Sequence, residues 1–145
     1  MNKDLVTLAA RQLPTLLLSC ALLTPGLAVS ADDAALSDAD MRRGRILFLQ
    51  CRACHSLNAG DNEGKIGPSL AGVFTRGAGG ASYYSAYSAA LQEADHEWTS
   101  ETMNRWITNP SAMVPGTSMV FAGVADAEQR DLLVRYLQVV TAPQE

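Results

Sequence analysis

The residues best suited to chemistry are two cysteines and a histidine within five positions, in the run Cys51-Arg52-Ala53-Cys54-His55. Two cysteines three positions apart on a helical turn point in the same direction, and the next residue projects beside them. Such a group can be a thioredoxin-like redox pair, half of a zinc site, or the C-x-x-C-H signature for attachment of a c-type haem. In the last case both thiols add to the vinyl groups of one porphyrin, and the histidine binds its iron.

The context of the motif favours haem attachment. A thioredoxin-like pair is expected in a βαβ context, but the residues before Cys51 show helical periodicity. A zinc site needs two further ligands, and His96 is the only other cysteine or histidine after residue 31. The sequence therefore predicts one haem c bound covalently to Cys51 and Cys54, with His55 as an iron ligand.

A methionine is the expected sixth ligand of such an iron. Four methionines follow residue 31: Met41, Met103, Met113 and Met119. The first two fall in segments with helical periodicity, where core packing is the expected role. The other two lie after Asn109-Pro110, in a segment expected to be a loop. Pro115-Gly116 before Met119 and Phe121 after it would make that loop stiff, which favours Met119 modestly.

Helical periodicity and capping residues predict the elements that must position these groups. Helices are expected over 38–51, over 85–94, from the Thr99-Ser100 cap to Asn109-Pro110, and from Asp126 to about Val140. Residues 58–80 and 111–124 are predicted to be loops. Long loops in small domains usually enclose something, and short helices alone bury little core. We therefore expect an all-α fold of four to five short helices and long loops wrapped around one covalent haem.

The first 31 residues are expected to be a secretory signal peptide. A weakly basic start precedes an apolar run over 13–29, and Val29-Ser30-Ala31 offers small side chains for signal peptidase. Two alternatives stay open. One is an uncleaved membrane anchor, although prolines interrupt the run, and the other is lipidation at Cys20.

Composition narrows the classes of function. The 145 residues include 11 basic and 15 acidic side chains, a formal net charge of −4, which argues against nucleic-acid binding. Removing residues 1–31 takes away two basic residues and one acidic residue, so the mature chain carries −5. Hydrophobic residues make up 48% of the chain, which argues against disorder. We expect an N-terminal tail over 32–36 and a single folded domain over 37–145.

Beyond the C-x-x-C-H motif, the chain from about 44 to 137 resembles class I cytochrome c, the family of mitochondrial cytochrome c and similar bacterial carriers. The matching pieces follow the family's order and separations. They are Gly44-x-x-x-Phe48, Gly67-Pro68-Ser69-Leu70, Tyr87, Trp98, Asn109-Pro110 and Pro115-Gly116-Thr117-Ser118-Met119-Val120-Phe121-Ala122-Gly123. The resemblance implies the class I cytochrome c fold and an electron-carrying function.

The resemblance also implies the ligand set. The pattern Pro-Gly-Thr-x-Met identifies Met119 as the sixth ligand, and the carbonyl of Pro68 is the acceptor that fixes the tautomer of His55. Thr117 and Asn109 match residues that help to hold the methionine loop.

Three residues occupy the family's propionate-binding positions: Arg76, Tyr87 and Trp98. Core packing is the alternative role for the two aromatic residues. Trp106 stands where mitochondrial cytochromes have a tyrosine near the methionine sulfur, so hydrogen bonding there should differ. Leu91 replaces an asparagine of a buried water network. His96 lies among acidic residues and is interpreted as a solvated side chain.

The sequence thus predicts a periplasmic monohaem carrier with His/Met-ligated iron that shuttles single electrons between protein partners of a respiratory chain. With both axial positions filled, no site remains for a substrate, so we do not expect an enzyme. We also expect a monomer with no stable membrane insertion after signal cleavage. Two alternatives stay open: a haem subunit of a larger dehydrogenase or oxidase, and a ligand-binding sensor or peroxidase-like protein with a labile methionine. A membrane anchor facing the periplasm is the alternative location.

Overall fold

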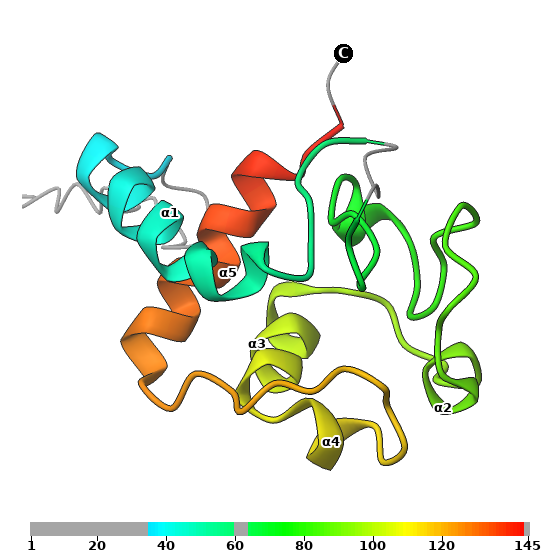
Figure 1. The fold of residues 1–145 in the computed structure, drawn as a ribbon. Coiled ribbons are helices and arrows are strands. Elements are labelled where there is room, and N and C mark those ends of the chain that lie inside the picture. The colour runs from blue at the N-terminus through cyan, green and yellow to red at the C-terminus, as the bar shows by residue number, and fades with distance from the viewer. Residues whose placement is uncertain (1–34, 60–63, 144–145) are drawn as a thin grey trace, which may run out of the picture. The chain divides into compact units, whose positions relative to one another are not determined.

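The computed structural model describes residues 35–59 and 64–143, so the expected signal peptide and Cys20 lie outside the described residues. Five α-helices and one 3-10 helix occur within these ranges (Figure 1): α1 (Asp38–Arg52), η2 (Val73–Thr75), α2 (Ala89–Gln92), α3 (Ser100–Thr108), α4 (Pro110–Met113) and α5 (Ala127–Val140). The same ranges contain no strand, only an isolated bridge between Gly77 and Glu97. The all-α prediction is confirmed.

Helix α1 carries the C-x-x-C-H motif at its C-terminal end, and its start is defined by capping. The Ser37 hydroxyl accepts a hydrogen bond from the backbone N–H of Asp40 at 3.1 Å and donates to the Asp40 carboxylate at 2.8 Å. Acidic side chains in the first turn favour the positive end of the helix dipole. The helix extends one residue beyond the expected range and buries Gly44 and Phe48.

Helices α1 and α5 cross in direct contact, and both contribute residues to the core (Figure 1). Asp126 caps α5 by accepting the backbone N–H of Gln129 at 2.8 Å. At the crossing, a Cβ atom on Gly44 would lie 2.5 Å from the Cβ of Tyr136, so only glycine allows the helices to approach this closely. The rings of Phe48 and Tyr136 lie 6.3 Å apart at the same contact.

Helix α2 is shorter than predicted, because it has four residues instead of the expected span of 85–94. Ser88 is its N-cap and accepts the backbone N–H of Leu91 at 3.3 Å. The preceding residues are held outside the helix by contacts of Tyr87, whose hydroxyl accepts the backbone N–H of Ala81 at 3.3 Å and whose ring packs edge-on against Tyr84. Contacts of this tyrosine with the residues just before it therefore compete with the local preference for helix.

The predicted loop over 111–124 is also partly wrong, because its first residues belong to helix α4. Asn109 and Pro110 do end α3, as expected for a residue before proline. The same pair then starts α4: the Asn109 side chain accepts the backbone N–H of Ala112 at 3.0 Å, and Pro110 takes the first helical position. The loop that carries Met119 is thus shorter and begins from a fixed helix end.

Candidate functional site

A cavity of about 240 Å³ lies between the end of α1, helix α3 and the long loops. It brings together ten of the eleven predicted site residues: Cys51, Cys54, His55, Pro68, Arg76, Tyr87, Trp98, Trp106, Thr117 and Met119. Asn109 is not among the lining residues, which fits its place as the N-cap of α4. Most of the remaining lining is apolar, including Leu70, Val73 and Ile107. Segments distant in sequence therefore form a single apolar pocket.

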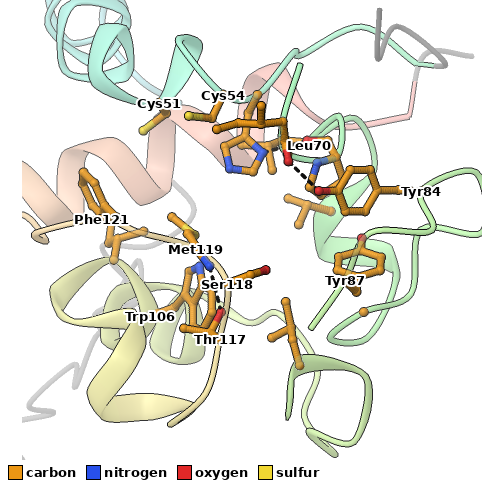
Figure 2. A pocket seen from close by; sticks show the side chains of 18 of the residues that line it. Cys51, Cys54, Leu70, Tyr84, Tyr87, Trp106, Thr117, Ser118, Met119 and Phe121 are labelled. Atoms are coloured by element: carbon orange, nitrogen blue, oxygen red, sulfur yellow. Dashed lines mark hydrogen bonds between the residues drawn. The ribbon is translucent and has the colours of Figure 1, made fainter. Parts of the chain in front are cut away.

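The two cysteines share one turn at the end of α1. Backbone N–H groups of Cys54 and His55 both donate to the carbonyl of Cys51, at 3.0 and 2.9 Å. Figure 2 shows both side chains at the same edge of the cavity. Burial, and then the neighbouring Cys54, raise the pKa of Cys51 to about 11. A dithiol that exchanges disulfides needs a lowered pKa, so this environment argues against a thioredoxin-like pair.

The His55 ring is fixed by a hydrogen bond between its Nδ1 and the backbone carbonyl of Pro68, at 2.7 Å. A proton on Nδ1 leaves Nε2 with a lone pair for a metal. Burial lowers the pKa of His55, and its hydrogen bond to Pro68 opposes that shift. The larger effect favours the neutral imidazole, which is the form that binds iron.

Backbone hydrogen bonds hold Pro68 in register with the motif. Gly67 donates to the carbonyl of Cys54 at 2.9 Å, and Leu70 donates to that of Ser56 at 2.8 Å. A Cβ atom on Gly67 would lie 2.5 Å from Cε1 of His55, so the imidazole packs directly on the glycine. The segment after the motif thus positions the acceptor and one face of the ring.

Three of the lining residues carry hydrogen-bond donors: Arg76, Tyr87 and Trp98. The guanidinium of Arg76 donates to the carbonyls of Ser69 and Ala71, at 2.6 and 2.5 Å, which leaves further N–H groups of the five it carries. Burial raises the pKa of Tyr87, so its phenol remains protonated and able to donate. Trp98 is buried and packs edge-on against Trp106 at 5.4 Å. These donors are suited to anionic groups of a bound ligand.

Met119 lies across the cavity from the cysteines, above Trp106 and Thr117 in Figure 2. Its backbone N–H donates to the Thr117 hydroxyl at 3.3 Å, and the Thr117 N–H donates to the carbonyl of Val114 at 3.1 Å. At the other end of the loop, the backbone N–H of Val124 donates to the carbonyl of Ile107 in α3 at 2.9 Å. Both ends of the methionine loop are therefore anchored to helices.

The structure separates the candidate methionines. Met113 does not line the cavity, whereas Met103 does, together with Met119. Met103 is 4% exposed within α3, where the sequence predicts core packing. The relevant comparison for a sixth ligand is therefore between Met119 and Met103.

Tyr84 is a site residue that sequence reasoning missed. Its hydroxyl donates to the carbonyl of Ile66 at 2.5 Å, and its ring packs edge-on against Tyr87 with centroids 4.8 Å apart. Both tyrosines line the cavity. The sequence of residues 81–90 contains three tyrosines among small residues, and this pattern could have indicated a site residue. A loop of this kind has no core of its own in which the tyrosines could be buried.

The interpretation of His96 as a solvated side chain is only partly right, because the residue is half-buried. Its Nε2 is buried and has no hydrogen-bond partner within the described residues. The ring packs edge-on against Trp98 with centroids 4.7 Å apart, and its backbone carbonyl accepts the N–H of Ala78 at 2.9 Å. The acidic neighbours in sequence are exposed, but the imidazole turns inward.

The donor set of the cavity fits a haem. Paired thiols, an imidazole whose Nε2 can bind a metal and a thioether line one apolar pocket, together with hydrogen-bond donors. In the described part of the chain, no group of three His, Cys, Asp or Glu side chains could hold a bare metal ion. The porphyrin of a haem supplies the equatorial ligands of its iron. These residues therefore suit a haem better than a zinc ion.

Comparison with known proteins agrees with this geometry. The family model described as cytochrome c matches residues 41–141. A cytochrome c2 of Blastochloris viridis is 39% identical over 116 residues, 80% of this chain and 88% of that protein. A cytochrome c of Arabidopsis thaliana is 37% identical over 103 residues, 70% of this chain and 90% of that protein. The solved structure of cytochrome cH from Methylobacterium extorquens matches with a TM-score of 0.62 and 35% identity, over 69% of this chain and 98% of the other. The chain therefore belongs to the cytochrome c family, and it is an electron carrier that binds one covalent haem c.

Proposed function

We propose that Cys51 and Cys54 attach the haem and that His55 and Met119 are the axial ligands of its iron. The observation that carries this proposal is the pairing of two side chains across one apolar cavity, His55 held by Pro68 and Met119 held by Thr117. When bound, the haem supplies a one-electron change between ferrous and ferric iron. A thioether ligand favours the ferrous state relative to a second imidazole and so raises the reduction potential.

The other site residues would hold the cofactor in place. Arg76, Tyr87 and Trp98 would donate hydrogen bonds to the propionates, whose burial without donors would be costly. Trp106 would pack beside Met119 and exclude water from the sulfur. Asn109 would have an indirect role. As the N-cap of α4, it would fix the helix from which the methionine loop begins.

We further propose a periplasmic location, as a monomer that serves redox proteins of a respiratory chain. Support comes from the leader-like composition of residues 1–31, which precede the domain proposed over 37–145. None of the helices in the described ranges is long and apolar enough to cross a membrane. The intact mass of the exported protein tests cleavage after Ala31, since a mass that includes residues 1–31 would instead favour an anchor.

Substitution of the two cavity methionines tests the ligand assignment. Met119→Ala should lower the reduction potential, open the iron to cyanide or carbon monoxide, and abolish the far-red band of sulfur-ligated ferric haem. Met103→Leu keeps the apolar volume and should leave the band and the ligand-binding behaviour unchanged. Met113→Leu is a second control, because Met113 does not line the cavity.

Loss of the band in Met103→Leu, with a folded protein, would contradict the assignment. Rapid ligand binding by the unsubstituted protein would instead support the alternative in which the methionine is labile. Co-purification with a dehydrogenase or oxidase would identify a bound subunit.

A further inference from the structure

The methionine loop ends where the chain passes over the C-terminal end of α3 and enters α5. The backbone N–H of Val124 donates to the carbonyl of Ile107 at 2.9 Å. Gly123 has a φ of +91°, and a Cβ atom there would lie 2.0 Å from the carbonyl oxygen of Thr108. The exit of the loop therefore packs directly on the end of α3.

A guanidinium group from α5 holds the same exit. Nη1 of Arg130 donates to the carbonyls of Val124 and Ala125, both at 2.8 Å. Its Nε donates to Oδ1 of Asn104 in α3 at 3.3 Å. An arginine side chain loses much rotational freedom when it is fixed, and the contact with Asn104 helps to keep this one directed at the loop.

Asn104 connects that guanidinium to a carboxylate on the next residue of α5. Its Nδ2 donates to Oδ1 of Asp131 at 2.5 Å, while its Oδ1 accepts from Arg130. Arginine can only donate and an ionised aspartate can only accept, whereas a carboxamide does both. The amide therefore has one orientation that satisfies both charged groups. We call Asn104, Arg130 and Asp131 the Asn104 cluster.

We propose that Asn104 is a positioning residue for the axial methionine: through Arg130 it keeps the exit of the loop closed and limits how often Met119 leaves the iron. This inference rests on the proposed role of Met119 as the sixth ligand. The exit at Val124 is five residues from Met119, so the thioether cannot move far while the exit stays in place. A bond that is made in the closed loop and broken in the open loop reduces the open population.

Binding of imidazole to the ferric holoprotein measures that open population. Imidazole reaches the iron only after Met119 leaves, so its apparent affinity is the intrinsic affinity multiplied by the open fraction. We expect Asn104→Ala to raise the apparent affinity about tenfold, because the variant loses hydrogen bonds to a charged group on each side.

Gln138→Ala is the matched control. Gln138 also joins α5 to α3, since its Nε2 donates to Oγ of Ser100 at 2.8 Å, but Ser100 is the first residue of α3 and the loop exit packs on the other end. Both variants should be less stable in urea, whereas Gln138→Ala should leave the affinity for imidazole within about twofold, because local openings are separate from global unfolding. Equal increases in affinity in the two variants would overturn the proposal.

An exchange of the amide and the carboxylate separates the role of the cluster from a loss of side-chain volume. In the double variant Asn104→Asp with Asp131→Asn, the new carboxylate can accept from Arg130 and the new amide can donate to that carboxylate. The affinity for imidazole should then remain close to that of the unsubstituted protein. A double variant that binds imidazole as tightly as Asn104→Ala would contradict the positioning role.

Hydrogen exchange of the Val124 amide reports the opening of the exit without reference to the iron. Asn104→Ala should speed that exchange about tenfold, and Gln138→Ala should affect it less. An exchange rate that is the same in Asn104→Ala and the unsubstituted protein would show that Asn104 does not hold the exit.

Met119→Ala separates a failure of this inference from a failure of the ligand assignment. It should bind imidazole tightly, and adding Asn104→Ala should change nothing further, because no methionine remains to be displaced. If Met119→Ala leaves imidazole binding unchanged, the ligand assignment fails. If Met119→Ala raises the affinity and Asn104→Ala does not, the assignment stands and the positioning role of Asn104 is wrong.

Discussion

At the scale of single residues, His96 carries a buried polar atom that has no hydrogen-bond partner among the described residues. Its buried Nε2 lacks a partner, and burial, followed by the charge of Arg105, lowers its pKa, with Asp95 opposing the shift. The folded state therefore disfavours the protonated imidazole. As the pH falls below about 6.5, the unfolded chain takes up a proton first, and folding stability is lost.

Substitution of His96 tests this pH dependence. We expect His96→Leu and His96→Gln to flatten the fall in stability between pH 7.5 and 5.5, measured by urea unfolding of the ferric holoprotein. His96→Leu should also remove an unsatisfied nitrogen, so its stability at pH 5.5 should exceed that of the unsubstituted protein by about 1 kcal/mol. An unchanged pH profile in both variants would show that other groups control it.

Gly67 is the residue whose side-chain size most directly limits the position of His55. Gly67→Ala would place a methyl group 2.5 Å from Cε1 of the imidazole, and overpacking of this kind costs about 2 kcal/mol. Gly77→Ala is the control, because its new methyl group would meet only a carbonyl oxygen at 3.5 Å. Urea unfolding of the two holoproteins compares them, and equal stabilities would contradict a steric role for Gly67.

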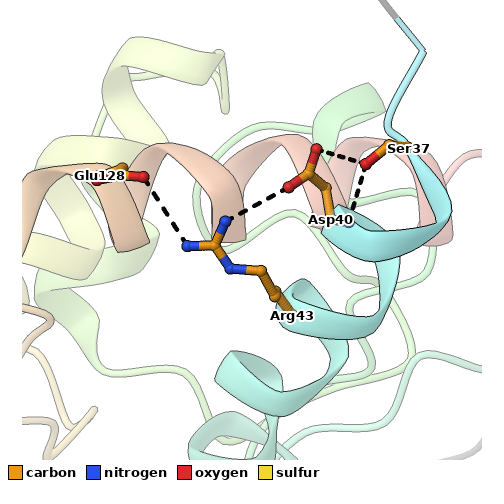
Figure 3. A network of polar contacts seen from close by, with 4 residues as sticks. All are labelled: Ser37, Asp40, Arg43 and Glu128. Atoms are coloured by element: carbon orange, nitrogen blue, oxygen red, sulfur yellow. Dashed lines mark hydrogen bonds and ion pairs between the residues drawn. The ribbon is translucent and has the colours of Figure 1, made fainter.

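At the scale of elements, apolar burial between α1 and α5 contributes more than their surface charges. Figure 3 shows the polar contacts at this junction, in which Arg43 lies 3.6 Å from Asp40 and 3.9 Å from Glu128. Both side chains of the interhelical pair are more than half exposed, and exposed pairs stabilise little. Leu133 of α5, in contrast, is fully buried in the core.

Two substitutions in α5 separate these contributions. Leu133→Ala should destabilise the holoprotein by about 3 kcal/mol, because a cavity remains where the side chain was. Glu128→Gln should change the free energy of unfolding by less than about 1 kcal/mol. A larger effect of Glu128→Gln, measured by the same urea titration, would mean that the charged network organises the helix crossing.

At the scale of the whole molecule, two exposed apolar side chains mark the mouth of the haem cavity. Val120 is fully exposed and Ile66 is 77% exposed, yet both line the cavity. The positions that carry lysines in mitochondrial cytochrome c are Ser111, Ala112 and Ser118, and all three are exposed. A partner that docks at this mouth would meet an apolar and weakly polar surface.

We therefore expect electron transfer to the natural partner to depend little on ionic strength, with association rates of roughly 10⁵–10⁶ per molar per second. Transfer to an acidic mitochondrial-type oxidase should be slow. Lysine at Ser111, Ala112 and Ser118 together should speed that reaction and introduce salt sensitivity. Stopped-flow kinetics at several salt concentrations measures both, and a native reaction that slows steeply with salt would identify the arginines of α1 as the docking site.

The sequence by itself determined the chemistry and most of the elements. Spacing identifies Cys51, Cys54 and His55 as one group, because a helical turn brings such residues together, and the surrounding sequence favours haem over a redox pair or a zinc site. Helices α1, α3 and α5 were also predictable, since their caps and apolar periodicity are local. The elements that differ from prediction, α2 and α4, are four residues long, which is too short for a helical period to show in the sequence.

Only the tertiary structure decided which distant residues share a pocket. The sequence assigned Met103 to core packing and left Met113 as a ligand candidate beside Met119, whereas folding places Met103 in the cavity and Met113 outside its lining. The use of Tyr84 likewise depends on its hydrogen bond to the carbonyl of Ile66, and His96 is placed by the pairing of its backbone carbonyl with the N–H of Ala78. Local sequence specifies helices and turns. The direction in which a side chain points depends also on contacts with segments that lie tens of residues away.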